Sequence, residues 1–341
     1  MSSAPTAEAI ARDATWCAQA LDPAAGIARL VAMDAAAYRA ASFLDDRLLQ
    51  SPVDSQLVPW PDIEAAMAGT PRNDARWIFH IGHVGSTLVS RLLGELPEVL
   101  GVREPRLLRD LALCPVPIRG RYLRHVAALM SRTFADDQIA CVKATSFASE
   151  IAAELVPANQ RALFLFTRPE NYIASILAGE NSVKELHHLT ASRGERSAQR
   201  IALPAPRHDA GLAAAAWACE MTALEAAAEA LSDSVGGRKL LWADFDAMLG
   251  DMRGALAQVA DHFGFAAGAV EAVAAGPLMK RYSKALEFDY SPALRCELIA
   301  KASGRFAADI ADALAMLRAG AEKSPLLARA LARAVVPAKE H

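Results

Sequence analysis

The chain has 341 residues, of which 53% are hydrophobic and 22% charged, and its formal net charge at pH 7 is −3. This composition is typical of a globular protein with a sizeable core, and it gives no general attraction to nucleic acid or to anionic membranes. The five cysteines are scattered, so we expect reduced thiols rather than a disulfide framework. No apolar run approaches the roughly 20 residues that span a bilayer, and the first residues lack a signal-peptide pattern. We therefore expect a cytoplasmic protein with no nucleic-acid or membrane partner.

The first 70 residues are rich in alanine, which favours helix because it loses no side-chain entropy there. Residues 9–20 and 24–41 are the two helix candidates. Prolines between Pro52 and Pro71 then indicate a loop-rich connection. We predict a helical N-terminal addition over residues 1–70.

Five short apolar runs follow, each too short for a helix. Continuous hydrophobicity without alternation is typical of strands that are covered on both faces. The runs are 77–81, 99–102, 139–142, 162–166 and 240–243. Because helical patterns separate them, we predict an α/β fold: a doubly wound parallel sheet of the P-loop type over 77–250, flanked by helices. Further helices are expected over 292–341, and the whole chain 1–341 is interpreted as a single domain.

Other segments of the core have clear patterns as well. Asp251 is a candidate N-cap and Gly264 a candidate residue just beyond the C-terminus of the same helix. Residues 211–231 form an apolar helical pattern. The polar segment 181–200 is interpreted as a lid or an acceptor-binding loop, and His80, inside a strand, as a core histidine.

The sharpest motif lies where the first core strand meets the following helix. It consists of Gly82, His83, Val84, Gly85, Ser86 and Thr87. Glycines allow a tight turn, and the free N–H groups and dipole of a new helix favour an anion. The pattern predicts a phosphate-binding loop, although a glycine turn that merely opens a crossover helix has the same pattern. It is not a Walker A loop, because Gly85 stands where that motif has its lysine.

At these residues the chain resembles the sulfotransferase family that uses 3′-phosphoadenosine 5′-phosphosulfate as its donor. In that family a basic residue, a small hydroxyl residue, a glycine and two hydroxyl residues follow the first strand and bind the 5′-phosphosulfate. Residues 83–87 match that frame at the glycine and the two following hydroxyl residues, with a histidine in the basic position and Val84 in the place of the first hydroxyl residue. The similarity continues over roughly 77–250 at Arg103-Glu104-Pro105, at Lys143, at the segment 166–175 and at the strand that ends in Asp244 and Asp246.

The resemblance implies ligands for the rest of the donor. Arg168 and Ser175 correspond to the family's 3′-phosphate motif, with the arginine seven residues before the serine rather than eight. Arg281 and Lys284 correspond to its basic C-terminal loop, although a solvated charge run has the same composition.

Three residues are the catalytic candidates. Glu104 follows the second strand and is interpreted as the general base, or alternatively as a carboxylate at the start of the next helix. Lys143 and His83 are interpreted as cations that neutralise charge on the transferring group, although a lysine at a strand end is often simply solvated.

The favoured function is therefore transfer of a sulfuryl group from 3′-phosphoadenosine 5′-phosphosulfate to a hydroxyl or amine of a small-molecule or glycan acceptor. No metal is expected, because protein cations can stabilise the leaving phosphate. One alternative is a small-molecule kinase with an atypical loop, which would use Mg²⁺ held by Ser86 or Thr87 and by Asp244 or Asp246. The other is a non-catalytic nucleotide-binding protein of the same fold.

Overall fold

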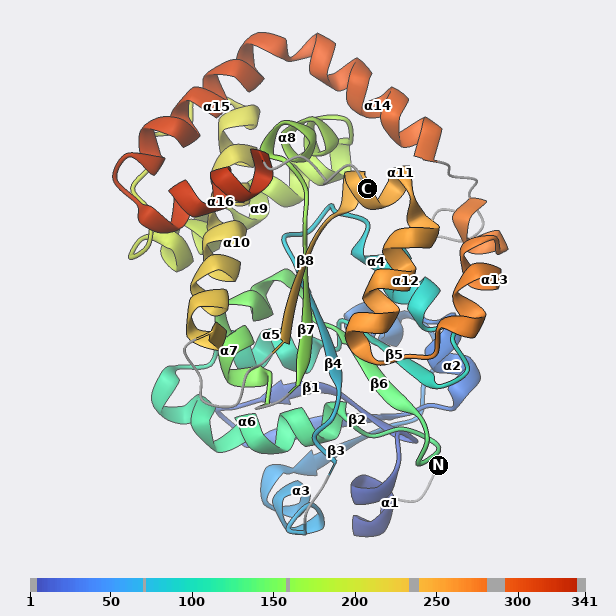
Figure 1. Cartoon of the computed structure of the whole chain (residues 1–341). Helices are drawn as coiled ribbons and strands as arrows, with labels where there is room; N and C mark the ends of the chain where they lie inside the picture. Colours follow the sequence, from blue (N-terminus) through green and yellow to red (C-terminus); the bar gives the residue numbers. More distant parts are fainter. Residues whose placement is uncertain (1–4, 70–71, 158–159, 233–238, 281–291, 336–341) are drawn as a thin grey trace.

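The computed structural model describes residues 5–69, 72–157, 160–232, 239–280 and 292–335. At its centre is a five-stranded parallel sheet with the strand order β5-β6-β4-β7-β8 (Figure 1). The strands are β4 (Arg76–His80), β5 (Val99–Arg103), β6 (Ile139–Lys143), β7 (Arg161–Phe166) and β8 (Lys239–Asp244). The five apolar runs of the sequence are these strands, so the prediction of a parallel α/β sheet is confirmed.

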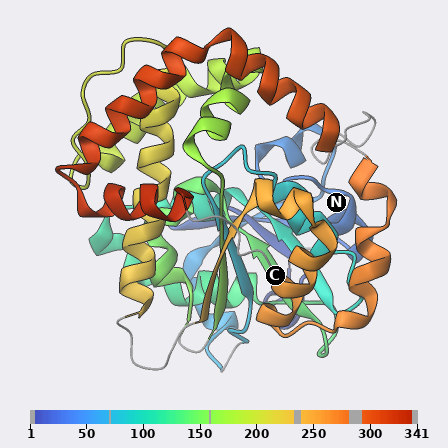
Figure 2. The same cartoon turned by 45° about the horizontal axis from the view of Figure 1, so that its top comes forward.

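The central strand is buried from Trp77 to His80, because helices cover both faces of the sheet. In Figures 1 and 2, α10 lies on one side of the sheet and α12 on the other. The covering helices are α4 (Ser86–Leu93), α5 (Arg106–Leu113), α6 (Val116–Met130), α7 (Ala152–Leu155), α8 (Pro169–Leu177), α9 (Glu180–Ser197), α10 (Asp209–Ser232), α11 (Phe245–Gly250), α12 (Met252–Phe263) and α13 (Val270–Ala274).

Two of these helices match their sequence signals closely. In α12, the Asp251 side chain accepts a hydrogen bond from the N–H of Gly254, and Gly264 ends the helix in the left-handed conformation. The helix expected over 211–231 is α10. The segment 181–200, by contrast, is not a loop. It forms α9, whose buried Leu186, Arg193 and Ser197 give a largely polar helix a packed face.

The N-terminal region differs from the prediction. Helices were expected over 9–20 and 24–41, but residues 16–59 contain a three-stranded antiparallel sheet. Its strands are β1 (Trp16–Asp22), β2 (Ile27–Ala32) and β3 (Ser55–Pro59), with the short helices α1 (Ala7–Arg12), α2 (Ala35–Ala40) and α3 (Trp60–Ala66) around them.

A local turn and long-range packing explain this difference. The Asp22 carboxylate accepts hydrogen bonds from the N–H groups of Ala24 and Ala25, and Gly26 has a φ of 64°. These features make a hairpin turn between β1 and β2. The strand β1 also packs on α5, where the N–H of Leu21 donates to the Asp110 carboxylate. Tertiary packing thus outweighs the helix propensity of alanine.

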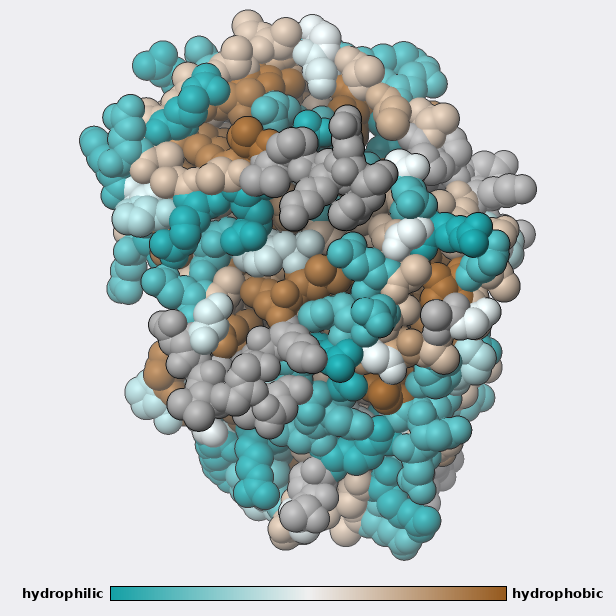
Figure 3. Space-filling view, viewed as in Figure 1, coloured by the Kyte–Doolittle hydropathy of each residue, from teal (hydrophilic) through white to brown (hydrophobic). Residues whose placement is uncertain are grey.

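The C-terminal helices expected after residue 292 are present as α14 (Pro292–Arg305), α15 (Ala307–Ala321) and α16 (Pro325–Val335). They pack on α8 and α10, and α14 passes across the end of the sheet where the parallel strands terminate (Figure 2). The face shown in Figure 3 is mainly hydrophilic over the N-terminal sheet. None of the described helices has the length and apolar character that a membrane span requires.

Candidate active site

The loop between β4 and α4 reverses the chain with an unusual run of left-handed residues. Gly82, His83 and Gly85 have φ values of 77°, 53° and 62°. Glycine adopts this conformation without strain, whereas a histidine does so only when its surroundings hold it there. The loop lies at the centre of the sheet, where the strand order reverses. In open α/β sheets this is the edge at which ligands bind.

The start of α4 suits an anion. Its first backbone hydrogen bond runs from the N–H of Val89 to the carbonyl of Gly85. The N–H groups of Ser86, Thr87 and Leu88 therefore come before the first helical bond and point out of the N-terminus. Both hydroxyl side chains of this turn line a cavity of about 580 Å³. The predicted loop thus has the geometry of an anion cradle, and its ligand stays a prediction.

Gly85 is required by a close contact as well as by its backbone. A Cβ atom at this position would lie 1.8 Å from Cζ of Phe245, the first residue of α11. At Gly82, in contrast, a Cβ would meet nothing within 4 Å. The aromatic ring of Phe245 therefore packs directly on the loop and lines the same cavity.

Lys143 connects the loop with the predicted base. The lysine is fully buried at the end of β6, and its Nζ lies 2.6 Å from Oε1 of Glu104. The same ammonium donates a hydrogen bond of 2.7 Å to Oγ1 of Thr87. It also lies 5.0 Å from the centre of the Phe43 ring. A solvated lysine, the alternative considered from sequence, does not describe this side chain.

Glu104 lies at the cavity wall in a strained conformation. Its φ is 51°, in the left-handed region that a non-glycine residue seldom adopts. Burial raises the pKa of this carboxyl, but the ammonium of Lys143 and the adjacent His80 ring lower it further than burial raises it. The net pKa of Glu104 lies below its ordinary value, so the carboxylate is ionised at neutral pH.

His80 supports both the loop and the carboxylate. Its Nδ1 accepts a hydrogen bond of 3.0 Å from the N–H of Gly82, so the ring proton resides on Nε2. That nitrogen lies 3.4 Å from Oε1 of Glu104. Burial lowers the pKa of His80 and outweighs the opposing effect of Glu104. The expected core histidine is therefore a neutral residue that links Gly82 to Glu104.

The cavity contains most of the residues predicted from the sequence. It is lined by Gly82, His83, Val84, Gly85, Ser86, Thr87, Glu104 and Ser175, and Lys143 contacts two of these from behind. The His83 ring lies edge-on to Tyr172, with its Nε2 3.8 Å from the Glu185 carboxylate. The loop, Glu104 and Lys143 thus converge on one space from three different strand ends.

Of the two described residues predicted to bind the 3′-phosphate, only one lines the cavity. Ser175 lines the cavity, where its hydroxyl donates to the carbonyl of Tyr172 at 2.9 Å. Arg168 is outside the lining, with its side chain 55% exposed and its Nε 3.9 Å from the Asp244 carboxylate. The neighbouring Thr167 points inward instead, onto Asp246. Arg281 and Lys284 lie outside the described residues.

The sequence reasoning missed several arginines that line the cavity. They are Arg47, Arg109, Arg193 and Arg295. Arg193 belongs to a face of α9 that also carries Glu185 and Leu189, at intervals of four residues. This spacing is visible in the sequence and would have indicated a helix, but the polar composition of the segment was interpreted as a loop.

The acidic pair at the end of β8 is engaged by other groups. Asp246 accepts hydrogen bonds from Thr167 and from Asn171, and Arg295 donates to it at 3.1 Å. Burial raises the pKa of Asp246, and these three partners lower it further than burial raises it. Within the described part of the chain, no group of three or more His, Cys, Asp or Glu side chains is arranged to hold a metal ion.

Comparison with known proteins gives structural neighbours alone. No protein-family description matches the sequence, and no curated protein matches it. A sulfotransferase domain of the curacin biosynthetic pathway aligns with a TM-score of 0.41 and 11% identity over 70% of this chain and 99% of that one. A sulfotransferase domain of the Synechococcus olefin synthase aligns with a TM-score of 0.40 and 14% identity, over 70% of this chain and 96% of that one. A Mycobacterium tuberculosis sulfotransferase aligns with a TM-score of 0.39 and 17% identity, over 73% of this chain and 79% of that one. With TM-scores this low, we draw no function from these matches.

Proposed function

We propose that this protein transfers a sulfuryl group from 3′-phosphoadenosine 5′-phosphosulfate to a hydroxyl or amine of an acceptor. The observation that carries the proposal is the position of Lys143. Its buried ammonium lies within hydrogen-bonding distance of both Thr87, in the anion cradle, and Glu104, the candidate base. The Lys143 ammonium thus lies between the loop that would hold the leaving phosphate and the carboxylate that would activate the incoming nucleophile.

In the proposed reaction, the acceptor oxygen attacks the sulfur atom and forms a new S–O bond. The bond between sulfur and the bridging oxygen of the 5′-phosphate breaks, and adenosine 3′,5′-bisphosphate leaves with that electron pair. Glu104 takes the proton of the acceptor hydroxyl. The loop N–H groups, Ser86, Thr87 and Lys143 stabilise the negative charge that develops on the phosphate. His83, at the turn of the loop, is assigned to the same charge.

A carboxylate with a lowered pKa is a weak base, and binding of the donor raises the pKa of Glu104 again. A phosphosulfate in the cradle competes with Glu104 for the ammonium of Lys143, because both anions lie beside the same nitrogen. Any weakening of the contact between Lys143 and Glu104 raises the pKa of the carboxyl. The base therefore becomes stronger when the donor is bound, which disfavours reaction before the site is complete.

The remaining donor contacts rest on the resemblance seen in the sequence. Arg168 and Ser175 are assigned to the 3′-phosphate, and Arg281 and Lys284 to the same end of the nucleotide. Ser175 lines the cavity as this assignment requires. Arg168 must leave Asp244 and turn toward the cavity to take part.

The kinase alternative is less well supported by the side chains present. A magnesium site would use a loop hydroxyl and an acidic residue after β8. Thr87, however, already accepts from Lys143, and Asp246 pairs with Arg295 and accepts hydrogen bonds from two neutral side chains. In a site made of Thr87 and Asp246, both groups would have to exchange their partners for the metal.

Thermal unfolding with nucleotides tests the proposal. Adenosine 3′,5′-bisphosphate should raise the melting temperature without Mg²⁺, as any ligand that binds the folded state does. Adenosine 5′-phosphate should raise it less at the same concentration, because it lacks one phosphate. A shift with ATP that requires Mg²⁺, together with none for the bisphosphate, would establish the kinase instead. Binding of the bisphosphate without any sulfuryl transfer from the donor would indicate the non-catalytic alternative.

A further inference from the structure

Arg193 is a buried cation in the wall of the candidate active site, and it is only partly neutralised. The residue is 8% exposed and lines the cavity. Its Nε lies 3.5 Å from Oε1 of Glu220, a long contact for an ion pair. Its Nη1 is buried and has no hydrogen-bond partner among the described residues. An unsatisfied charged donor in such a place costs free energy unless a ligand completes it.

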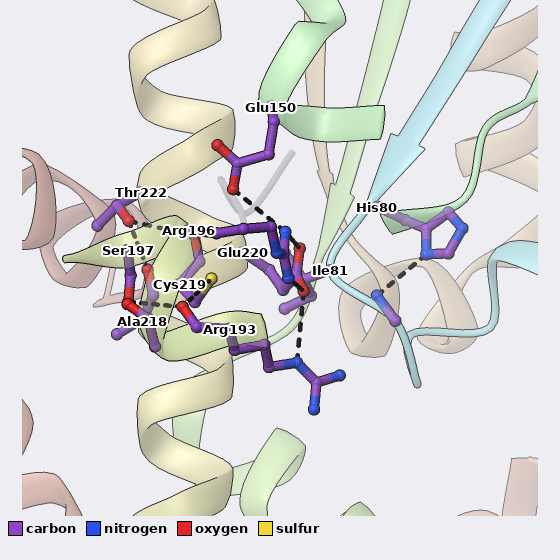
Figure 4. Close-up of polar contacts among 12 residues, drawn as sticks. His80, Ile81, Glu150, Arg193, Arg196, Ser197, Ala218, Cys219, Glu220 and Thr222 are labelled. Atoms are coloured by element: carbon purple, nitrogen blue, oxygen red, sulfur yellow. Dashed lines mark hydrogen bonds and ion pairs between the residues drawn. The ribbon is translucent and has the colours of Figure 1, made fainter. Parts of the chain in front are cut away.

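The acidic groups around Arg193 are already shared with other arginines. Arg196 lies 2.6 Å from Glu220, much closer than Arg193 does. Arg196 also lies 3.1 Å from Glu150, and Arg200 lies 2.6 Å from the same carboxylate. Three arginines therefore face two glutamates, which leaves one positive charge in excess. Figure 4 shows Arg193, Arg196, Glu150 and Glu220 of this cluster, with the Arg193 guanidinium extending from Glu220 away from α10.

A second arginine extends the positive region to the cavity mouth. Arg109 lines the same cavity and is exposed, and no carboxylate pairs with it in the described part of the chain. Its guanidinium carbon lies 4.7 Å from the centre of the Phe147 ring, and that of Arg196 lies 4.4 Å from the same centre. Phe147 thus places Arg109 next to the cluster that contains Arg193.

The positions of these arginines along α5 and α9 favour the acceptor side of the cavity over the side assigned to the nucleotide. Arg109 is in α5, the helix that begins directly after Glu104 and Pro105. In α9, Ser182 lies beside Gly179, near the Ser175 end of the cavity. Arg193 is eleven residues further along α9, about 16 Å at 1.5 Å per residue.

We propose that the acceptor carries an anionic group, such as a carboxylate, and that Arg193 and Arg109 bind it. This inference rests on the proposed function, because it assigns the acceptor of that reaction. A planar guanidinium binds a carboxylate through two parallel hydrogen bonds, and Nη1 of Arg193 provides a donor that is already desolvated. The anionic group fixes the acceptor at one end, while its hydroxyl faces Glu104.

Matched pairs of small hydroxyl compounds test the inference by calorimetry without any nucleotide. Each pair consists of a carboxylate and its primary amide, for example para-hydroxymethylbenzoate with para-hydroxymethylbenzamide, and a phenyl glucuronide with its glucuronamide. We expect carboxylates to bind wild-type protein at least about tenfold more tightly than their amides, the usual effect of a charge-assisted contact. Equal binding within every pair would overturn the proposal.

Variants identify the site of the preference. Arg193→Gln and Arg109→Gln should each reduce it about tenfold or more. Arg124→Gln, an exposed arginine of α6 outside the cavity, should leave it unchanged. Arg109 is exposed, so its variant is informative even if Arg193→Gln destabilises the fold. A preference that survives in Arg109→Gln and in a folded Arg193→Gln, but is lost in Ser86→Ala, would place the carboxylate in the loop and overturn the proposal.

Adenosine 3′,5′-bisphosphate separates this inference from the proposed function. Wild-type protein and both arginine variants should bind it equally, because the arginines contact the acceptor. If the bisphosphate does not bind wild-type protein while the arginine-dependent preference persists, the donor assignment is wrong and the anion site stands. If the bisphosphate binds and no carboxylate is preferred, the donor assignment stands and the acceptor inference is wrong.

Discussion

Lys143 and Glu104 are brought together by the register of two neighbouring strands. Arg103 pairs with Lys143 at the end of β5 and β6, and the N–H of Glu104 donates to the carbonyl of Lys143 at 2.8 Å. Glu104 has a left-handed backbone conformation, and its Oε1 lies 2.6 Å from the ammonium of Lys143. The ion pair is therefore part of the sheet edge, and its loss affects stability as well as chemistry.

Lys143→Met should destabilise the protein strongly. It leaves the Glu104 carboxylate largely buried without its cation, and breaking such a pair costs about 3–5 kcal/mol. Urea unfolding at neutral pH measures the loss. The control is the double variant Lys143→Met with Glu104→Gln, in which no buried charge is left unpaired. It should be more stable than Lys143→Met alone. If the single variant is no less stable than the double one, the carboxylate does not depend on the ammonium.

The parallel sheet could be predicted because the physical cause is local. A strand covered on both faces needs an unbroken apolar run, and Trp77, Val142 and Phe164 lie in such runs. The N-terminal sheet could not be predicted in the same way. Its alanines have no strong strand preference, and only the turn from Asp22 to Gly26 signalled a hairpin. The packing of β1 on α5, which is distant in sequence, decides the outcome.

In the candidate site, too, some residues could be placed from local sequence and others depend on long-range packing. The loop and Glu104 lie directly after strands, so sequence position was enough to place them at one edge. Arg193 and Arg109 reach the cavity from helix faces, and their position depends on how α9 and α5 pack. The identification of Arg168 rested on the motif alone, and the structure places Thr167, not Arg168, toward the interior.

Gly85→Ala and Gly82→Ala form a matched pair in the loop. Both replace a glycine with positive φ, which costs about 1–2 kcal/mol. Only the alanine at position 85 also collides with Phe245. We therefore expect Gly85→Ala to lose binding of adenosine 3′,5′-bisphosphate and to be the less stable variant. Calorimetry and urea unfolding measure both effects, and equal behaviour of the two variants would show that the Phe245 contact does not shape the cradle.

His80 should contribute to the loss of stability in mild acid. Burial lowers the pKa of the folded histidine below 6.5, so the unfolded chain binds more protons as the pH falls through that value. The free energy of unfolding should therefore fall as the pH is lowered from about 7.5 to about 5.5, and His80→Gln should reduce that fall. His188→Gln, an exposed histidine of α9, is the control and should leave it unchanged. The same pH dependence in His80→Gln and wild-type protein would mean that His80 is protonated in the folded state as readily as in the unfolded one.

Arg168→Ala and Ser175→Ala test the assignment of the 3′-phosphate. If Arg168 turns inward on binding, its removal should weaken adenosine 3′,5′-bisphosphate by about 1.5–3 kcal/mol and adenosine 5′-phosphate far less. Ser175, a neutral partner, should contribute about 0.5–1.5 kcal/mol to the same ligand. Calorimetry of both nucleotides gives the comparison. Equal weakening of the two nucleotides by Arg168→Ala would mean that this arginine does not contact the 3′-phosphate.

Glu104→Gln separates the proposed base from a structural role. Glutamine keeps the shape of the side chain but cannot accept a full proton. Sulfuryl transfer should fall by about 10² to 10⁴, the usual contribution of a positioned base. Donor binding should not weaken, because the substitution removes a negative charge beside an anionic nucleotide and beside Lys143, which contacts the phosphate. Single-turnover transfer to an acceptor found by screening measures the first effect, and calorimetry with adenosine 3′,5′-bisphosphate the second.

The competing explanation predicts the opposite combination. If Glu104 serves mainly to hold Lys143 in place, its substitution displaces the ammonium from Thr87 and weakens the bisphosphate. Glu104→Asp distinguishes the two roles further, because it retains a carboxylate but withdraws it by one methylene group from both neighbours. If Glu104 is the base, the distance of the carboxylate from the acceptor matters. Glu104→Asp should then restore little of the transfer rate, while donor binding stays near that of the wild type. Near-normal transfer in Glu104→Gln, with tight binding of the bisphosphate, would show that another group takes the proton.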